Sequence, residues 1–108
     1  MALTRDFKAT IQKRVQRDAA FRRELLREGI ECMLAGEVDT GKIVLRDYIN
    51  ATVGFNDLAE VVHRSPKSLM RMLGPRGNPQ AKNFFQIVAY LMRHEGIRFE
   101  LRTIAART

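Results

Sequence analysis

Apolar residues in this chain recur at the spacing of an α-helix, in successive segments that are separated by helix caps, glycines and prolines. Residues 19–34 show the pattern clearly, because Arg22, Arg23, Arg27, Glu28 and Glu31 fall opposite an apolar set made up of Phe21, Leu25, Leu26, Ile30, Met33 and Leu34. Amphipathic segments of this kind bury their apolar faces against one another. The sequence therefore predicts an all-α fold, a bundle of five to six helices.

Start and stop signals divide the first half of the bundle. Thr4 and Asp18 are predicted N-caps, Gly36 is a predicted stop, and Asp39 or Thr40 is the predicted start of a third helix. We expect the apolar residues of that third helix to face the core, namely Ile43, Val44, Tyr48, Ile49 and Val53.

Residues 55–73 have the pattern of two short helices joined by a tight turn. Leu58 and Val62 form an apolar pair on the first helix, and Leu69, Met72 and Leu73 form the matching stripe on the second. Ser65 is a natural N-cap, and Pro66 follows it at the first helical position, where its missing N–H costs nothing. This pattern predicts a helix-turn-helix, whose second helix lies in the major groove of DNA.

The predicted second helix and its surroundings present residues that suit a DNA duplex. Lysine and arginine donate to guanine O6 and N7, and serine bonds bases or phosphates. The candidate DNA-binding residues are those exposed on this helix, at the turn before it and in the segment after it: Arg64, Ser65, Lys67, Ser68, Arg71, Arg76 and Lys82.

The distribution of charge supports this interpretation. The formal net charge is +7, and residues 61–94 contain six Lys or Arg residues but none of the 12 acidic residues of the chain. A long acid-free basic segment is typical of a surface that faces phosphates. We interpret residues 1–37 as an N-terminal helical arm, and residues 38–108 as a helix-turn-helix DNA-binding domain.

After a loop at residues 74–79 with two glycines and two prolines, an apolar helix runs to Gly96. Its period predicts that Phe84 and Phe85 belong to the core and do not stack on bases. The tail at residues 97–102 alternates apolar and charged residues, which is the period of a half-buried strand. We expect this β-like tail to pair with a second copy, to pack flat on the helices or to stay irregular.

From residue 43 onward the sequence resembles the helix-turn-helix domain of the addiction-module antidote family, an antitoxin-side domain of the phage-repressor-like (Xre) group. The resemblance depends on residues 45–51, Leu58-Ala59, the serine-capped residues 65–73, Gly77-Asn78-Pro79, and the helix that ends at Gly96 with residues 97–101 after it. It implies a five-helix DNA-binding domain, usually dimeric, that represses its own operon. It also implies that some members neutralise a ribonuclease-type toxin.

The resemblance places Ser65, Lys67, Ser68 and Arg71 on the family's recognition helix. The family turn usually carries a glycine and then an apolar residue, where this chain has His63 and Arg64. His63 is therefore expected to adopt the backbone conformation that the glycine normally takes, and Arg64 to point outward.

Other classes of function find little support in the sequence. His63, His94 and Cys32 lack the spacing of a metal site, and no nucleophile is paired with a base. We therefore expect no catalysis, no cofactor and no metal. Without a signal peptide or an apolar span, the chain is expected to be cytoplasmic and not a membrane protein.

The leading hypothesis is a sequence-specific transcriptional regulator that binds double-stranded DNA as a homodimer, with the tail and the N-terminal arm as candidate dimer elements. The alternative is a protein-interaction module that binds and neutralises a toxin or another protein through the N-terminal helices, with Phe7, Ile11, Phe21 and Leu25 forming an apolar groove. A weaker alternative is an amphipathic helix that lies on a membrane surface.

Overall fold

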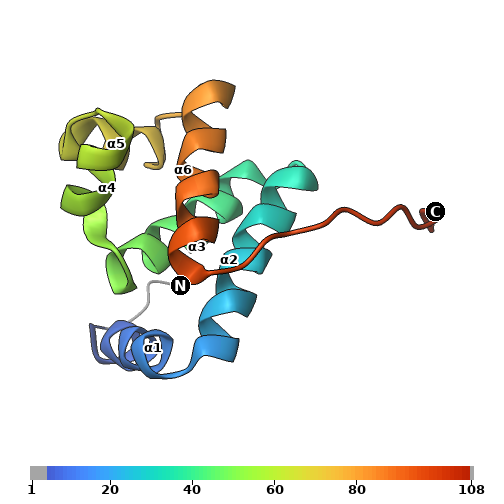
Figure 1. Ribbon diagram of the computed structural model, residues 1–108, viewed down its shortest axis with the longest axis horizontal. Coiled ribbons are helices and arrows are strands. Elements are labelled where there is room, and N and C mark those ends of the chain that lie inside the picture. The colour runs from blue at the N-terminus through green and yellow to red at the C-terminus, as the bar shows by residue number, and fades with distance from the viewer. Residues whose placement is uncertain (1–4, 108) are drawn as a thin grey trace.

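The computed structural model describes the backbone of residues 5–107 and the side chains of residues 9–107. Within this range the chain is helical and contains no strand (Figure 1). The helices are α1 (Arg5–Arg17), α2 (Ala19–Leu34), α3 (Val38–Ala51), α4 (Gly54–Val62), α5 (Pro66–Met72) and α6 (Ala81–Glu95). The prediction of an all-α fold is confirmed for the described residues.

The predicted helix boundaries agree in part with the structure. The Asp18 side chain accepts a hydrogen bond of 3.1 Å from the backbone N–H of Phe21, so Asp18 caps α2 as expected. Gly36 follows the end of α2 with a φ of 85°, a left-handed conformation that glycine adopts without strain. The predicted cap at Thr4 lies outside the described residues.

The predicted start of the third helix is wrong by one or two residues. α3 begins at Val38 after Glu37, which makes no side-chain cap hydrogen bond. The expectation had rested on Asp39 and Thr40 being good capping residues. Instead, the backbone of Glu37 accepts the first helical hydrogen bond, from the N–H of Gly41 at 3.0 Å. The helix therefore begins before Asp39 and Thr40, although these two residues have the stronger local preference for the capping position.

The core gathers side chains from five helices, α2 to α6. Its buried members are Leu26, Leu45, Tyr48, Ile49, Phe55, Leu58, Ala59, Leu69, Leu73, Ile87 and Leu91. α2 and α3 approach closely, because a Cβ on Gly41 would lie 2.7 Å from the sulfur of Met33. α2 therefore packs directly on α3, and it contributes Leu26 to the same core as the later helices.

Two expected core residues, Ile43 and Phe85, are exposed. Ile43 is 58% exposed because the buried face of α3 is centred on Leu45, and Ile43 lies about 160° around the helix from that face. Phe85 is 63% exposed, while its neighbour Phe84 is partly buried against the core. The period of α6 buries Ile87 and Leu91 instead.

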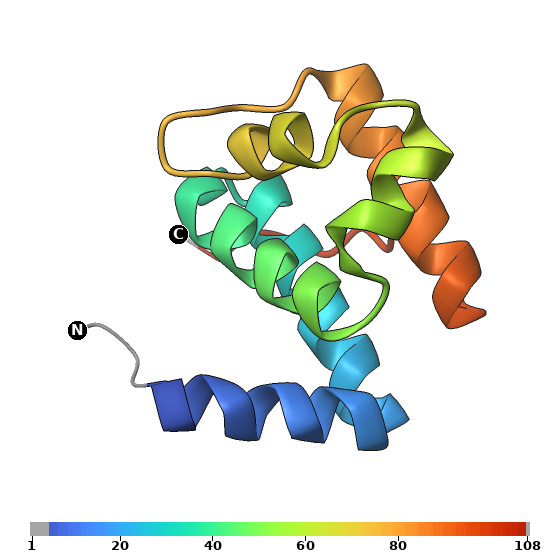
Figure 2. The same cartoon turned by 90° about the vertical axis from the view of Figure 1, so that its left-hand side faces the viewer.

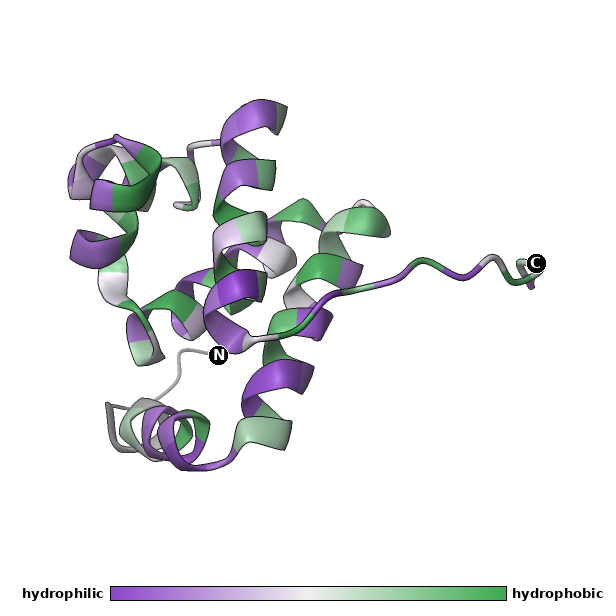
Figure 3. Cartoon of the chain, in the orientation of Figure 1, coloured by the Kyte–Doolittle hydropathy of each residue, from purple (hydrophilic) through white to green (hydrophobic). Residues whose placement is uncertain are grey.

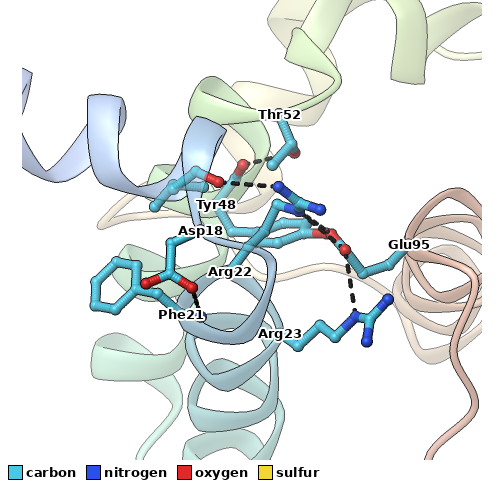
Figure 4. Close-up of polar contacts among 8 residues, drawn as sticks. Asp18, Phe21, Arg22, Arg23, Tyr48, Thr52 and Glu95 are labelled. Atoms are coloured by element: carbon cyan, nitrogen blue, oxygen red, sulfur yellow. Dashed lines mark hydrogen bonds and ion pairs between the residues drawn. The ribbon is translucent and has the colours of Figure 1, made fainter.

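A polar network ties α6 to the helices before it (Figure 4). The buried Glu95 accepts hydrogen bonds from Arg22 Nε, at 2.7 and 2.9 Å, and from the Tyr48 hydroxyl. Arg22 also donates to the backbone oxygen of Val15 on α1, and Arg23 Nε lies 3.7 Å from Glu95. Three helices, α2, α3 and α6, therefore meet at one carboxylate, and Arg22 links this site to α1.

The C-terminal tail follows α6 without regular secondary structure up to residue 107. Ile97 and Phe99 pack partly against the core, whereas Leu101 is 87% exposed. Strand pairing of this tail with a second copy stays a prediction. None of the described helices has the length and apolar character needed to cross a membrane.

Figures 1 and 2 show the layout that positions the candidate site. α1 lies at one end of the molecule. α5, the loop after it and the first turns of α6 lie together at the opposite end in both views. The elements that carry the candidate residues 64–82 therefore share one end of the fold.

Candidate nucleic-acid interface

A turn of three residues joins α4 to α5. α4 buries Phe55, Leu58 and Ala59, and α5 buries Leu69, so the two short helices share the core. His63 ends α4 in the left-handed conformation, with φ 56° and ψ 46°. It is the one non-glycine residue with positive φ in the described part of the chain. The expectation that His63 takes a conformation typical of glycine is confirmed.

Ser65 and Pro66 start α5 as the sequence predicts. Ser65 is extended, with φ −73° and ψ 150°, and its side-chain oxygen accepts a hydrogen bond of 3.1 Å from the backbone N–H of Ser68. Pro66 occupies the first turn of the helix. The Ser65 hydroxyl therefore satisfies a backbone N–H of the first turn and stabilises the start of α5.

The candidate cationic residues of this end are exposed. Lys67 and Arg71 are exposed on α5, Arg76 is exposed in the following loop, and Lys82 is exposed in the first turn of α6. These four side chains form no ion pair with any acid of the described residues. Their charge is therefore not compensated within the described part of the chain, which favours attraction of an anionic partner. We call these four residues the basic face.

Two further candidates play a more local part in the structure. Arg64 is exposed and donates through Nη2 to Oδ1 of the buried Asn83, at 3.3 Å, so it links the turn to α6. Ser68 is half-buried, and its backbone N–H is engaged in the cap of α5. The structure thus brings all seven candidates to one end of the fold, with Arg64 and Ser65 also supporting its geometry.

The loop after α5 lies directly on the end of that helix. A Cβ on Gly77 would lie 1.9 Å from the backbone oxygen of Arg71, so a side chain at this position would require the loop to move. The N–H of Gly74 donates to the same oxygen of Arg71, at 3.1 Å. These contacts hold the loop, and with it Arg76, beside α5.

A buried lysine that was not predicted as a functional residue holds this loop in place through hydrogen bonds. Lys42 on α3 is 2% exposed, and its Nζ donates to the backbone oxygens of Gly74, at 3.0 Å, and Gly77, at 2.7 Å. The side-chain oxygen of Asn78 accepts a third bond, at 3.3 Å, and Asp39 lies 3.5 Å away. The one available signal was the helical spacing of Lys42 with Leu45 and Ile49, which places the lysine on a buried face.

Other reactive side chains are not gathered into a second site. The described residues contain no group of three or more His, Cys, Asp or Glu side chains suited to a metal ion. Cys32 is half-buried, and burial together with the nearby carboxylates of Glu37, Glu28 and Glu31 raises the pKa of its thiol. A raised pKa lowers the fraction of the nucleophilic thiolate.

Comparisons of the chain with models of protein families, with curated proteins and with solved structures found no match. The resemblance to the antidote family therefore stays a prediction, and the function is argued from the residues themselves.

Proposed function

We propose that the protein is a sequence-specific DNA-binding transcriptional regulator, in which α4, the turn and α5 act as a helix-turn-helix. The basic face is the observation that carries this proposal. Lys67, Arg71, Arg76 and Lys82 are exposed and unpaired within the described residues, and they lie on α5 and on the segments beside it. No acid interrupts residues 61–94. Phosphate backbones attract such a surface at long range.

Under this proposal α5 lies in the major groove. Lys67, Ser68 and Arg71 then reach base edges, where the two cationic side chains donate to guanine O6 and N7. Arg76 and Lys82, which flank α5, contact the phosphates and set the position of the helix along the groove. The left-handed turn at His63 and the cap at Ser65 support this docking, because they end α4 and start α5 within three residues.

Selection from a random duplex pool with the full chain tests the proposal. We expect enrichment of one motif, and binding that weakens steeply as salt rises because phosphate contacts release counterions. A variant with Lys67→Gln and Arg71→Gln should lose the enrichment. The matched control, Lys13→Gln with Arg17→Gln, removes the same charge from α1 and should keep it. Absence of any enriched motif with the parent chain contradicts the proposal.

A hollow on α2 favours a second candidate function, the binding of a basic protein such as a toxin. The hollow has a volume of about 300 Å³ and combines the apolar Phe21 and Leu25 with Arg27 and the carboxylates of Glu24, Glu28 and Glu31. Arg27 pairs with Glu24 and Glu31, so Glu28 is the carboxylate of the hollow that Arg27 does not pair with. Co-purification of a stoichiometric small basic protein that is lost with Glu28→Lys supports this function. Retention on heparin with steep salt dependence, and without such a partner, supports DNA binding.

A further inference from the structure

An apolar groove runs along the side of the molecule, between the end of α2 and the start of α6. Its volume is about 430 Å³, and its walls include Ile30, Leu34 and Val38 on one side, and Pro79, Phe84 and Phe85 on the other. Leu34 is 66% exposed and Phe85 is 63% exposed, so two large apolar side chains stand at the groove without cover. Apolar surface of this kind is typical of an interface.

The C-terminal tail carries some apolar side chains that do not pack on the helices of the same chain. Ile97 and Phe99 pack on the core, and this contact starts the tail in a direction that takes it past α2 and away from the helices (Figure 1). Leu101 and Ile104 are 87% and 74% exposed. Figure 3 shows apolar and polar residues interspersed along this projecting path.

We propose that the tail of a second copy of this chain occupies the groove, so that two copies exchange tails in a two-fold dimer. Leu101 and Ile104 are the inserted side chains. Their three-residue spacing places both on one side of an extended chain with three residues per turn. Both copies carry one groove and one tail, so the same contact forms twice and the assembly closes on itself.

Length and charge agree with this occupant. Residues 100–107 span about 25 Å in the same three-residue-per-turn conformation, which compares with molecular extents of 39 × 31 × 31 Å, so a projecting tail reaches well onto a neighbouring copy. The tail carries Arg102 and Arg107 beside one acid, Glu100. Glu37 and Asp39 are exposed and flank the groove residue Val38 in the sequence, and Asp39 also lies 3.5 Å from Nζ of Lys42. A tail of net positive charge therefore meets an acidic edge.

Sedimentation of the free protein tests the inference, which does not depend on DNA binding. We expect the full chain to be a dimer in the micromolar range. A tail variant, Leu101→Asp with Ile104→Asp, and a groove variant, Phe85→Asp, should each be monomeric. Val61→Asp is the matched control, because Val61 is also an exposed apolar residue, at 43%, but lies on α4 away from the groove. It should remain dimeric.

Mixing the two variants separates tail exchange from misfolding. The tail variant keeps an intact groove and the groove variant keeps an intact tail, so their equimolar mixture should form a heterodimer with one tail inserted. A monomeric parent chain, a dimeric tail variant, or a mixture that stays monomeric overturns the inference. Circular dichroism of each variant confirms that its helices are intact.

Discussion

His63 holds the turn between α4 and α5 in a conformation that a side chain disfavours. The left-handed region crowds Cβ against the following carbonyl oxygen, and glycine avoids this cost. We expect His63→Gly to raise the free energy of unfolding by about 0.5 to 1 kcal/mol, the difference between relief of that strain and the added freedom of glycine in the unfolded chain. Urea denaturation measures it. His63→Ala keeps a Cβ in the same conformation and should bring no gain. An equal gain from both variants contradicts the explanation by backbone strain.

Arg71 is the residue of α5 for which the proposed function makes the sharpest prediction. Arginine binds guanine through two hydrogen bonds, so Arg71→Ala should weaken binding to the selected duplex and relax preference at one base pair by about 1–3 kcal/mol. Competition binding with single-base variants of the selected site measures this change. Arg17→Ala removes the same charge from α1 and should leave the preference intact. Unchanged affinity for Arg71→Ala would show that Arg71 does not contact a base.

At the scale of residues, local chemistry was predictable and long-range contacts were not. The caps at Asp18 and Ser65 follow from the side chain and the three residues after it, and both are present. The glycine-like conformation of His63 was expected from the family resemblance, because the family turn carries a glycine at this position. Lys42 was missed because its partners lie 32 to 36 residues away, so no local pattern indicates them.

At the scale of elements, α5 and its loop form a unit that α3 supports through one lysine. Lys42→Met removes the donor that serves Gly74 and Gly77, so the oxygen of Gly77 loses this bond and that of Gly74 keeps the one from the N–H of Gly77, at 3.3 Å. We expect a loss of about 1–3 kcal/mol in the free energy of unfolding.

The proposed function adds a second expectation. The losses of DNA affinity from Lys42→Met and Arg76→Ala should overlap, because both changes disable the same loop.

A double-mutant cycle in DNA affinity measures this overlap, with an expected coupling of about 1 kcal/mol. Lys13→Met is the control, since Lys13 is an exposed lysine on α1 and should show no coupling with Arg76→Ala. Strictly additive effects of Lys42→Met and Arg76→Ala would show that the hydrogen bonds from Lys42 to the loop do not position Arg76.

The helices could be predicted because their apolar period repeats over many residues, but the period does not fix which side of a helix meets the core. Ile43 and Phe85 were assigned to the core as apolar members of helical segments, and both are exposed. The face that is buried depends on neighbouring helices. The tail has the alternation of a strand but no partner strand in the described residues, so its local pattern alone does not form a sheet.

At the scale of the whole molecule, charge and polar contacts divide between its two ends. The basic face lies with α5, whereas the ion pairs of Arg14, Arg22 and Arg27 involve acids of α2, the residue before it and the end of α6. The acid-free segment was visible in the sequence, and the structure places α5, the loop after it and the first turns of α6 at one end, from which α6 runs toward the other (Figure 2). The contact between Arg22 and Glu95 joins residues 73 apart and was not predictable from spacing.

The same contact makes the stability of the whole bundle sensitive to acid. Burial acts to raise the pKa of Glu95, but hydrogen bonds from Arg22 and Tyr48 and the charges of Arg22 and Arg23 outweigh it, so the pKa lies below its ordinary value of about 4.5. Between these two values the unfolded chain binds a proton that the folded chain does not. The contribution of Glu95 is therefore complete above the ordinary pKa and is lost as the pH falls through the lowered one.

Glu95→Gln tests this dependence, because it removes the titrating group but keeps its shape. At pH 7 we expect the variant to lose about 3 kcal/mol of unfolding free energy, since Arg22 then lacks its carboxylate partner. The difference from the parent should shrink as the pH falls below about 4.5, where the unfolded parent binds a proton, and should vanish once the pH lies below the lowered pKa of the folded parent. Glu100→Gln, at an exposed ion pair with Arg98, should change stability little at any pH. Urea denaturation from pH 7 to pH 3 measures both, and a difference for Glu95→Gln that stays constant over this range contradicts a folded-state carboxylate with a lowered pKa.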